Sequence, residues 1–530
     1  MSRRSFWSFA AGVAALAAPF TAGSQIITDA HTRLNVPAGF GTERYLRALQ
    51  VAGIALYYPW SVRGFGPDEL ARVMPAADST HPWQARMKQS SARYQLYVLA
   101  PGVEGIYNTT APYGNNDGAL WAGRGLTTDL KFGFGASAGP VSLVVAPEAF
   151  RAENRGFPLR QIASPGASPF ADPYNPKNID EPQRFGDRSY QRFDPGQSTL
   201  RIAPGPVAFG FSTANEYWGP AVDNPVILGN NAAGFPHVFA GTSHPLDLWI
   251  ATVHTRVIWG RLDQSSYSPL TQGDNRRFGT GLVGLVTVRG LPGLEVGVSR
   301  FYHERWPRGG PRGSDINLPF TLHNFAASRA NLAGMDATNQ LASVFARWVF
   351  PDAGIEAYGE FGREDFGTDI NDVIAEPDHD AAYTVGVQRV WKRGGNRLVA
   401  FRAEAMDSRI THLVNVRRQT PMYVHSPVTQ GHTQLGQVLG SPAGRGGGAI
   451  EFGVDMYGPR GQWTFEASRL FANSVSRTDP DVYYAVTAQR LWFGRHADYW
   501  VALTPSIELN RTPGVDAGNF NFRVGTLVHW

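Results

Sequence analysis

The sequence contains no cysteine, which excludes a disulfide scaffold, a cysteine-based zinc site and a cysteine nucleophile. Beyond the N-terminal segment it also lacks any run of about 18 consecutive apolar residues, which excludes membrane-spanning helices. A chain of this kind that crosses a membrane does so with β-strands. An excess of either charge is absent too. The net charge is +4, or +2 once the charges of Arg3 and Arg4 are removed, so we expect no nucleic-acid partner.

Residues 1–24 have the layout of a cleavable secretory signal. Arg3 and Arg4 precede an apolar run over residues 6–18, and small residues follow it. We therefore exclude this segment from the fold and predict export with removal of the signal. The two arginines also resemble a twin-arginine signal, a pathway for folded cargo that fits poorly with a barrel.

The next part of the chain has a helical pattern. Thr42 is placed to cap one helix, Pro67 with two following acids is typical of a second helix start, and a third helix is predicted from Pro82 to Tyr94. We therefore predict a small helical, periplasmic subdomain over residues 25–125, followed by a barrel with long loops over residues 126–530.

From Leu126 onward the pattern has a period of two. Between Ile355 and Phe361, for example, apolar or small residues alternate with Glu356, Tyr358 and Glu360. Each such segment is about ten residues long, the length that a tilted strand needs to cross the hydrocarbon layer. A soluble β-sandwich rarely has so many strands in sequence. The fold class predicted is thus an all-β transmembrane barrel, and the 14 Trp suit its aromatic girdles.

The C-terminal segment is the clearest of these strands. Phe520, Phe522 and Val524 alternate with polar or small residues, and the chain stops on Trp530. A barrel must pair its last strand with its first, because an open edge aggregates. A terminal strand that ends on an aromatic residue resembles the C-terminal signal of bacterial outer-membrane barrels. This resemblance implies an outer-membrane location and a barrel assembly machinery as partner.

Two long segments do not alternate and are rich in polar residues and proline. They are Arg151 to Arg192 and Phe301 to Asn339. Bacterial barrels join their strands by short periplasmic turns and long external loops. We expect both segments to lie outside the cell or folded into the lumen.

The densest group of polar and aromatic residues runs from Asn215 to His237. An acid and a tryptophan precede Gly219-Pro220, and a short apolar run leads to two adjacent asparagines. This pattern resembles the hallmark segment of the Wzi capsule assembly family, and the order of signal, helical region and strands agrees with it. The candidate polysaccharide-binding residues are Glu216, Tyr217, Trp218, Asp223, Asn230 and Asn231.

The resemblance implies a barrel of about 18 antiparallel strands with a helical bundle on its periplasmic side. It also implies a lectin that attaches capsular or exported polysaccharide to the cell surface, and not an enzyme. We expect a monomer that contacts outer-membrane lipids and lipopolysaccharide and that needs no cofactor or metal.

The residue chemistry of this segment suits a sugar site but leaves alternatives open. Carboxylates and amides bind hydroxyl pairs, and Tyr217 and Trp218 offer rings on which a sugar can stack. The competing interpretation is a structural turn in which Glu216 and Asp223 pair with arginines of the barrel wall. The two acids could also form a glycosidase pair. For the whole protein, a diffusion porin and an outer-membrane glycan hydrolase remain the alternatives.

The first prediction concerns location. Cell fractionation should find the mature protein in the outer membrane, and the band should be heat-modifiable on gels. A variant without the last strand should fail to assemble, because an unpaired strand edge is left in lipid. Recovery of the wild-type protein as a soluble periplasmic species would contradict the barrel.

Overall fold

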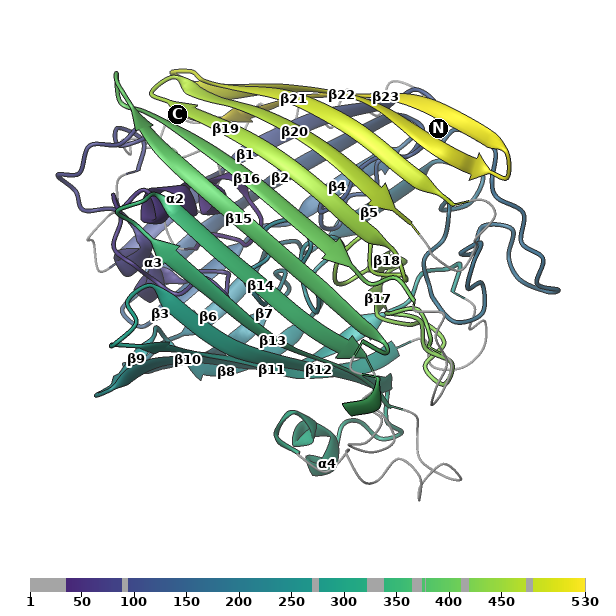
Figure 1. Ribbon diagram of the computed structural model, residues 1–530, viewed down its shortest axis with the longest axis horizontal. Helices are drawn as coiled ribbons and strands as arrows, with labels where there is room; N and C mark the ends of the chain where they lie inside the picture. The colour runs from purple at the N-terminus through teal and green to yellow at the C-terminus, as the bar shows by residue number, and fades with distance from the viewer. Residues whose placement is uncertain are drawn as a thin grey trace.

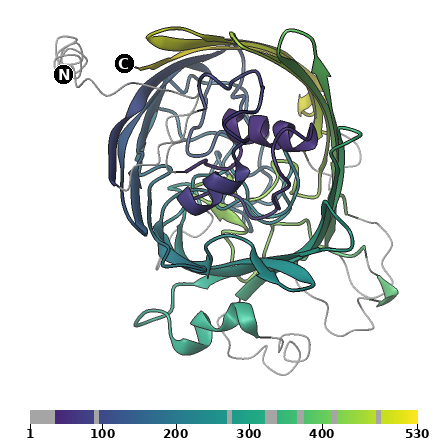
Figure 2. The same ribbon diagram turned by 90° about the vertical axis from the view of Figure 1, so that its left-hand side faces the viewer.

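The chain forms one closed β-barrel, seen from the side in Figure 1 and along its axis in Figure 2. The computed structural model describes residues 35–87, 94–268, 276–321, 338–364, 374–376, 378–410, 419–472 and 480–529. The predicted signal at residues 1–24 and the terminal Trp530 lie outside the described residues.

Among the described residues, the barrel wall is one antiparallel sheet of 21 strands. The pairs β3/β4, β5/β6 and β8/β9 are the halves of three interrupted strands, so the chain crosses the sheet 18 times, in agreement with the predicted fold class. The strands are β1 (Tyr94–Asn108), β2 (Gly125–Ala138), β3 (Val141–Val145), β4 (Glu148–Ala152), β5 (Tyr190–Asp194), β6 (Thr199–Ile202), β7 (Val207–Ser212), β8 (His237–Thr242), β9 (Leu246–Leu248), β10 (Ala251–Asp263), β11 (Arg276–Val288), β12 (Leu294–Arg305), β13 (Thr338–Phe350), β14 (Ile355–Glu364), β15 (Ala381–Arg393), β16 (Arg397–Asp407), β19 (Gly448–Gly458), β20 (Gly461–Phe471), β21 (Val482–Phe493), β22 (Ala497–Thr512) and β23 (Val515–Val528).

The barrel closes where its first strand meets its last. β1 pairs with β23 over the register from Gly102↔Leu527 to Asn108↔Asn521. This seam satisfies the backbone groups of both strands, as a membrane requires, because hydrocarbon offers them no hydrogen bonds. The alternating segment that contains Phe520 and Phe522 is therefore the strand that seals the barrel.

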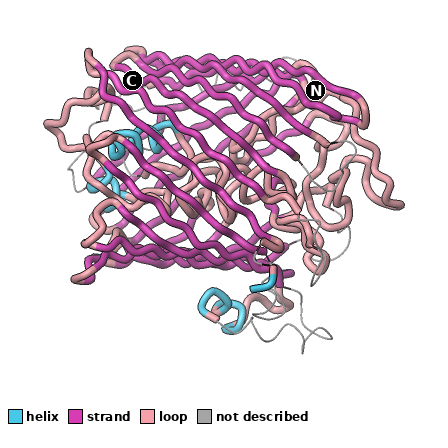
Figure 3. Tube along the Cα trace, viewed as in Figure 1, coloured by secondary structure: helices cyan, strands magenta, loops and turns pink. Residues whose placement is uncertain are grey.

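The two ends of the barrel differ in their connections. At one end, which we call the short-turn end, every connection between strands has two to five residues, as in 289–293 and 394–396. At the other, the long-loop end, connections are as long as 153–189 and 408–447. Figure 3 shows the loops gathered there, beyond the strands. In bacterial outer-membrane barrels, such short turns lie at the periplasmic end and long loops at the external end.

The outer surface of the wall is apolar. On β15, for example, Tyr383, Val385 and Val387 are exposed to 40%, 59% and 40%, whereas Thr384 faces the lumen and is buried. The same alternation holds on β14, where Glu356 and Tyr358 point inward, as the sequence pattern predicted. Such an apolar outer band with a polar interior is the property of a transmembrane barrel.

A plug formed by residues 35–87 fills the lumen near the short-turn end. It contains α2 (Gly41–Val51) and α3 (Pro67–Val73), which lie inside the ring of strands in Figure 2. Leu46 and Leu49 of α2 belong to an apolar cluster that includes Leu398 and Tyr457 of the wall. Because this face of α2 packs on the wall, the helix is held by tertiary burial and not by its length.

Short elements complete the described structure. They are α4 (Gly313–Ile316), η1 (Leu318–Phe320), β17 (Thr433–Gln434) and β18 (Gln437–Val438). No helix among the described residues is long and apolar enough to cross a membrane.

Three predictions about the N-terminal region were wrong in detail. The barrel begins with β1 at Tyr94, so the predicted boundary at residue 126 is too late in the chain. The predicted third helix is absent over residues 82–87, of which 82–86 form turns, while residues 88–93 lie outside the described part. The first helix starts after Phe40 instead of at Thr42, but the second starts at Pro67 as predicted. A single strand without a clear alternation is easily taken for the end of a helical region.

Buried ion pairs join the plug to the wall. Arg47 of α2 contacts Glu356 of β14 at 2.7 Å, and the same carboxylate contacts Arg347 of β13 at 2.6 Å. All three side chains are at most 2% exposed. A charge at such a depth is tolerated only when it is paired, so each member of this triad depends on the others.

The second prediction follows from this triad. Glu356→Leu should lower the free energy of unfolding by about 3–5 kcal/mol, because Arg47 and Arg347 both lose their shared buried partner. The gel transition between folded and heat-modified forms should shift to lower temperature. Asp247→Asn is the matched control, since it breaks the exposed pair with Arg289 and should cost about 1 kcal/mol or less. Equal heat resistance of the two variants would show that the triad does not anchor the plug.

Candidate functional site

The sequence motif forms the connection between β7 and β8 and runs through the barrel lumen. Residues 213–236 pass beside the plug: Val62 forms a β-bridge with Trp218, and the Gly219 amide donates to the Ser61 carbonyl at 2.9 Å. Val226, Ile227 and Leu228 are buried in the larger apolar core of the lumen. The motif is therefore an internal strap, in contact with both plug and wall.

Glu216 and Trp218 serve to fix this strap. The Glu216 carboxylate contacts Arg256 at 2.7 Å and His237 at 3.0 Å, and the Trp218 indole donates to it at 3.2 Å. Burial alone would raise the pKa of Glu216, but the Arg256 charge and the His237 hydrogen bond outweigh it and lower the pKa to about 2. The indole itself packs against Phe301.

Tyr217 has a similar role. Its hydroxyl donates to the Val222 carbonyl at 2.8 Å, and the Arg63 guanidinium of the plug lies over its ring at 4.0 Å. The side chains of Tyr217 and Trp218 are both fully buried. The stacking role that the sequence suggested needs a ring face open to a ligand, and neither ring has one. The structural interpretation fits these two residues better.

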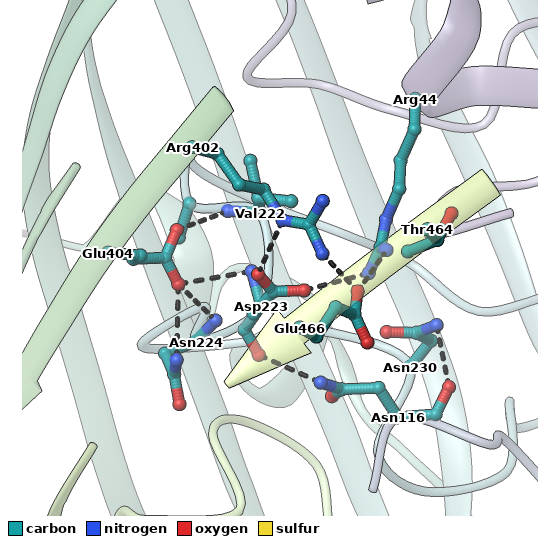
Figure 4. Close-up of polar contacts among 12 residues, drawn as sticks. Arg44, Asn116, Val222, Asp223, Asn224, Asn230, Arg402, Glu404, Thr464 and Glu466 are labelled. Atoms are coloured by element: carbon teal, nitrogen blue, oxygen red, sulfur yellow. Dashed lines mark hydrogen bonds and ion pairs between the residues drawn. The ribbon is translucent and has the colours of Figure 1, made fainter. Parts of the chain in front are cut away.

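A wall carboxylate holds the turn that follows. Glu404 of β16 accepts hydrogen bonds from the backbone amides of Val222, Asp223 and Asn224, at 2.6, 3.0 and 2.6 Å, as Figure 4 shows. The Tyr358 hydroxyl donates to the same carboxylate at 2.7 Å. Because the amides belong to the backbone, this contact fixes the shape of the turn whatever side chains it bears.

Asp223 projects from this turn into a network of charges. It contacts Arg44 of α2 at 2.7 Å and Arg402 of β16 at 3.3 Å. Arg402 also contacts Asp455 at 2.7 Å and Glu466, while Arg44 reaches Glu466 at 3.3 Å. Burial opposes ionisation of Asp223, but the two guanidinium groups prevail and hold its pKa below the usual range.

The two predicted asparagines tie the strap to the loop between β1 and β2. The Asn230 amide donates to the Asn116 carbonyl at 3.0 Å, and Asn231 accepts a hydrogen bond from the Asn116 backbone amide at 3.3 Å. The Asn116 side chain in turn donates to the Asp223 carbonyl at 2.9 Å. Asp223, Asn230 and Asn231 are thus brought together through Asn116. Glu216 and Tyr217 instead contact Arg256 and Arg63, and Trp218 packs against Phe301.

A cavity of about 430 Å³ lies between this cluster and the wall formed by β19 to β23 and β1. Its volume is within the range of about 300–1,000 Å³ that ligand sites occupy. Of the six predicted residues, Asp223 lines it. The other lining groups include aromatic rings, amides, hydroxyls and charged groups, among them Tyr113, Trp500, Asn115, Gln462, Gln489, Thr464, Thr487, Thr504, Arg44, Arg402, Arg523, Glu104, Asp117, Glu451 and Glu466.

The lumen is packed unevenly around this cavity. On β14 the inward-facing side chains Glu356, Tyr358 and Glu360 are buried under the plug and strap. On β21 the inward-facing Thr487 and Gln489 remain partly exposed. Space for a ligand therefore remains along the wall of β20 to β22.

Most of the residues that line the cavity were missed by sequence reasoning. Arg402 and Glu404 could have been recognised from the sequence. They follow Leu398 and Ala400 at alternate positions of β16, so all four side chains point into the lumen. A charge at an inward position of a barrel strand needs a partner in the lumen. The loop residues Tyr113 and Asn115 carried no such signal.

The remaining sequence candidates resolve differently. Glu216 and Asp223 line separate cavities, so the structure does not present them as the facing carboxylates of a glycosidase. Arg445, at the long-loop end, is paired with Asp172 and with Glu181 at 2.7 Å. The long segment after β4 spans residues 153–189 at the long-loop end, and Ile179 from it joins the lumen core. The segment after β12 begins at residue 306, later than predicted, and its residues 322–337 lie outside the described part.

Similar proteins agree with this architecture. One solved structure superposes on this chain with a TM-score of 0.60 at 14% identity. It is described as Wzi, an outer-membrane protein involved in group 1 capsule assembly in Escherichia coli and a carbohydrate-binding β-barrel. The match covers 94% of this chain and 100% of that one, and it shows the fold. The Pseudomonas aeruginosa barrels OpdQ and OpdO superpose less well, with TM-scores of 0.39 at 8% and 10% identity. These matches cover 82% of this chain and 98% of theirs.

No curated protein matches the chain in sequence. The family model described as "Capsule assembly protein Wzi" matches residues 106–475, which include the strap, the loop between β1 and β2, and the wall strands β2 to β19. A match over this share of the sequence, together with the barrel fold, supports the outer membrane as its location. The chain belongs to the Wzi capsule assembly family.

Proposed function

We propose that this protein binds capsular or exported polysaccharide and attaches it to the cell surface. The observation that carries the proposal is the lumen cavity beside Asp223, whose wall combines aromatic rings with many hydrogen-bonding groups. Amides, hydroxyls and carboxylates match the paired hydroxyl groups of sugars, and rings such as that of Trp500 match their apolar faces. The family and the carbohydrate-binding barrel to which the fold is similar support the same conclusion.

The proposed site differs from the one that the sequence suggested. We assign sugar contact to Asp223 and to the wall residues Thr487 and Gln489, which line the cavity. Asn230 and Asn231 support the site by holding the loop that bears Asn116. Glu216, Tyr217 and Trp218 keep the strap in place. No reaction is assigned, because a binding cavity of this composition accounts for the proposed role without one.

The topology of the protein in the cell follows from the same proposal. Residues 1–24 are removed on export, and the barrel assembly machinery inserts the barrel into the outer membrane as a monomer. The short-turn end with the plug faces the periplasm, and the long-loop end, in contact with lipopolysaccharide, faces the polysaccharide.

The third prediction tests the cavity as a sugar site. Gln489→Ala with Thr487→Val removes hydrogen-bonding groups from the cavity wall, so the affinity for the cell's own polysaccharide should fall about 3- to 10-fold. Binding to the purified barrel and the share of polysaccharide that stays on cells would both be measured. Val486→Ala is the matched control, because Val486 lies on the same strand and faces outward, 58% exposed.

The double variant and Trp218→Ala distinguish residues that bind sugar from residues that stabilise the fold. A folded, heat-modifiable double variant with normal polysaccharide binding would remove the cavity from the site. Trp218→Ala, in contrast, should lower heat resistance, since deleting a large buried ring costs about 3–5 kcal/mol.

The fourth prediction addresses the porin alternative. The wild-type protein should give little steady ion conductance in planar bilayers, because the plug and the strap obstruct the lumen. The folded state of the protein would be verified by its heat-modified band in the same preparation. Large, stable, ohmic channels would favour a porin over a polysaccharide-binding barrel.

A further inference from the structure

Arginines are concentrated at one part of the short-turn end. The hairpins β15/β16, β19/β20 and β21/β22 carry Arg389, Arg393, Arg397, Arg460, Arg490 and Arg495, and we call these six the basic rim. The strands of these hairpins are neighbours in the sheet and lie side by side in Figure 1.

Ion pairs within the described part of the protein do not balance the charge of the basic rim. No member forms an ion pair with any residue that the structure describes, and the turns 392–397, 458–461 and 493–497 contain no acid. The nearby Asp498 faces the lumen, where it contacts Arg86 at 2.6 Å and His529 at 3.2 Å. On the opposite side of the same end, by contrast, Arg289 is paired with Asp247.

One pair of the basic rim is unfavourable in the isolated protein. Arg393 and Arg397 stand directly opposite each other across the β15/β16 hairpin, with Lys392 beside them. Like charges at facing positions of an antiparallel pair repel each other and destabilise it. An anion bound between them would relieve this repulsion.

Two arginines of the basic rim point outward from the barrel, which places the bound anion at the membrane. Arg389 and Arg490 have the outward parity of the lipid-facing Val387 and Val486. Their guanidinium groups reach toward the short-turn end: Arg389 lies over the Trp391 ring at 5.2 Å, and Arg490 over the Trp492 ring at 5.4 Å.

Arg490 is flanked by a second indole as well. Trp463 stands opposite it on β20, with its ring 5.3 Å from the guanidinium, and it is 43% exposed. Exposed tryptophans of a barrel mark the level of the lipid headgroups, and long cationic side chains extend from the hydrocarbon to that level. The basic rim is thus at headgroup depth on the outside of the barrel.

We propose that the basic rim binds the headgroups of anionic phospholipids in the periplasmic leaflet. The phosphate groups would lie between the facing arginines of the turns and the guanidinium groups held against Trp391, Trp463 and Trp492. The outward direction of Arg389 and Arg490 selects a lipid over a periplasmic polymer, because these side chains start from the lipid-facing surface. The proposal does not depend on the sugar site in the lumen.

The fifth prediction is a preference for anionic lipid. Full-length protein purified in detergent is offered equal amounts of phosphatidylglycerol and phosphatidylethanolamine, and the lipids retained are counted by native mass spectrometry. The wild-type barrel should retain phosphatidylglycerol preferentially. Changing Arg393, Arg397 and Arg490 together to Gln should reduce that preference at least about tenfold, since each basic residue near a lipid surface adds to anionic binding.

Matched variants separate charge from structure. The same three positions changed to Lys should keep the preference. Arg305, Arg308 and Arg312, which are exposed toward the long-loop end, form the control triple, and their change to Gln should leave it unaltered. If the rim triple does not fold, the wild-type preference should still fall as salt rises from about 0.05 to 0.5 M.

Several outcomes would overturn the proposal. They are an absence of preference in the wild-type barrel, a preference that salt does not alter, and an equal loss in the control triple. A folded variant of the three rim arginines could also keep its lipid preference but bind an anionic glycan less tightly. That result would assign the basic rim to polysaccharide instead.

Discussion

The pairing of β1 with β23 is the constraint on which the rest of the structure depends. Hydrocarbon cannot hydrogen-bond to a free strand edge, so the sheet has to close. Closure separates an apolar outer surface from an interior that has no lipid to face. The inward positions can then be polar, and the wall can carry Glu404, Arg402 and Glu356 where a soluble sandwich would need apolar side chains. The charges of the lumen are a consequence of the closed sheet.

Those interior charges in turn decide what the lumen holds. Glu356 needs Arg47 of the plug, Glu216 needs Arg256, and Glu404 needs the backbone amides of the strap. Each contact is made between wall and filling, so neither is electrostatically complete alone. The same network positions Asp223 at the edge of the cavity, between Arg44 and Arg402. Anchoring of the filling and shaping of the candidate site are therefore parts of one arrangement.

The sequence predicted the barrel well because its signal is local. Alternation on β14 and at Phe520 to Val524 depends only on which face each residue takes, and the resemblance of the strap to the Wzi family supplied the strand number. The site was harder. The side chains of Trp218 and Gln489 can both form hydrogen bonds. In the folded barrel, however, the Trp218 ring packs against Phe301, whereas Gln489 lines a cavity. That difference depends on how plug, strap and loop pack together, which no short stretch of sequence encodes. The start of β1 was missed because part of it lacks a regular alternation.

The even number of strands has a consequence for the order of assembly. Both the entry to β1 and the end of β23 lie at the short-turn end, and the plug precedes β1 in the chain. The seam needs the last strand to be made, so plug and strap are already synthesised when it forms. Once it has formed, a strap tied to β7 and β8 and crossed by the plug has no way in or out. The plug and the strap must therefore enter the lumen before β1 pairs with β23. A poorly packed interior would slow this pairing before it lowered the stability of the closed barrel.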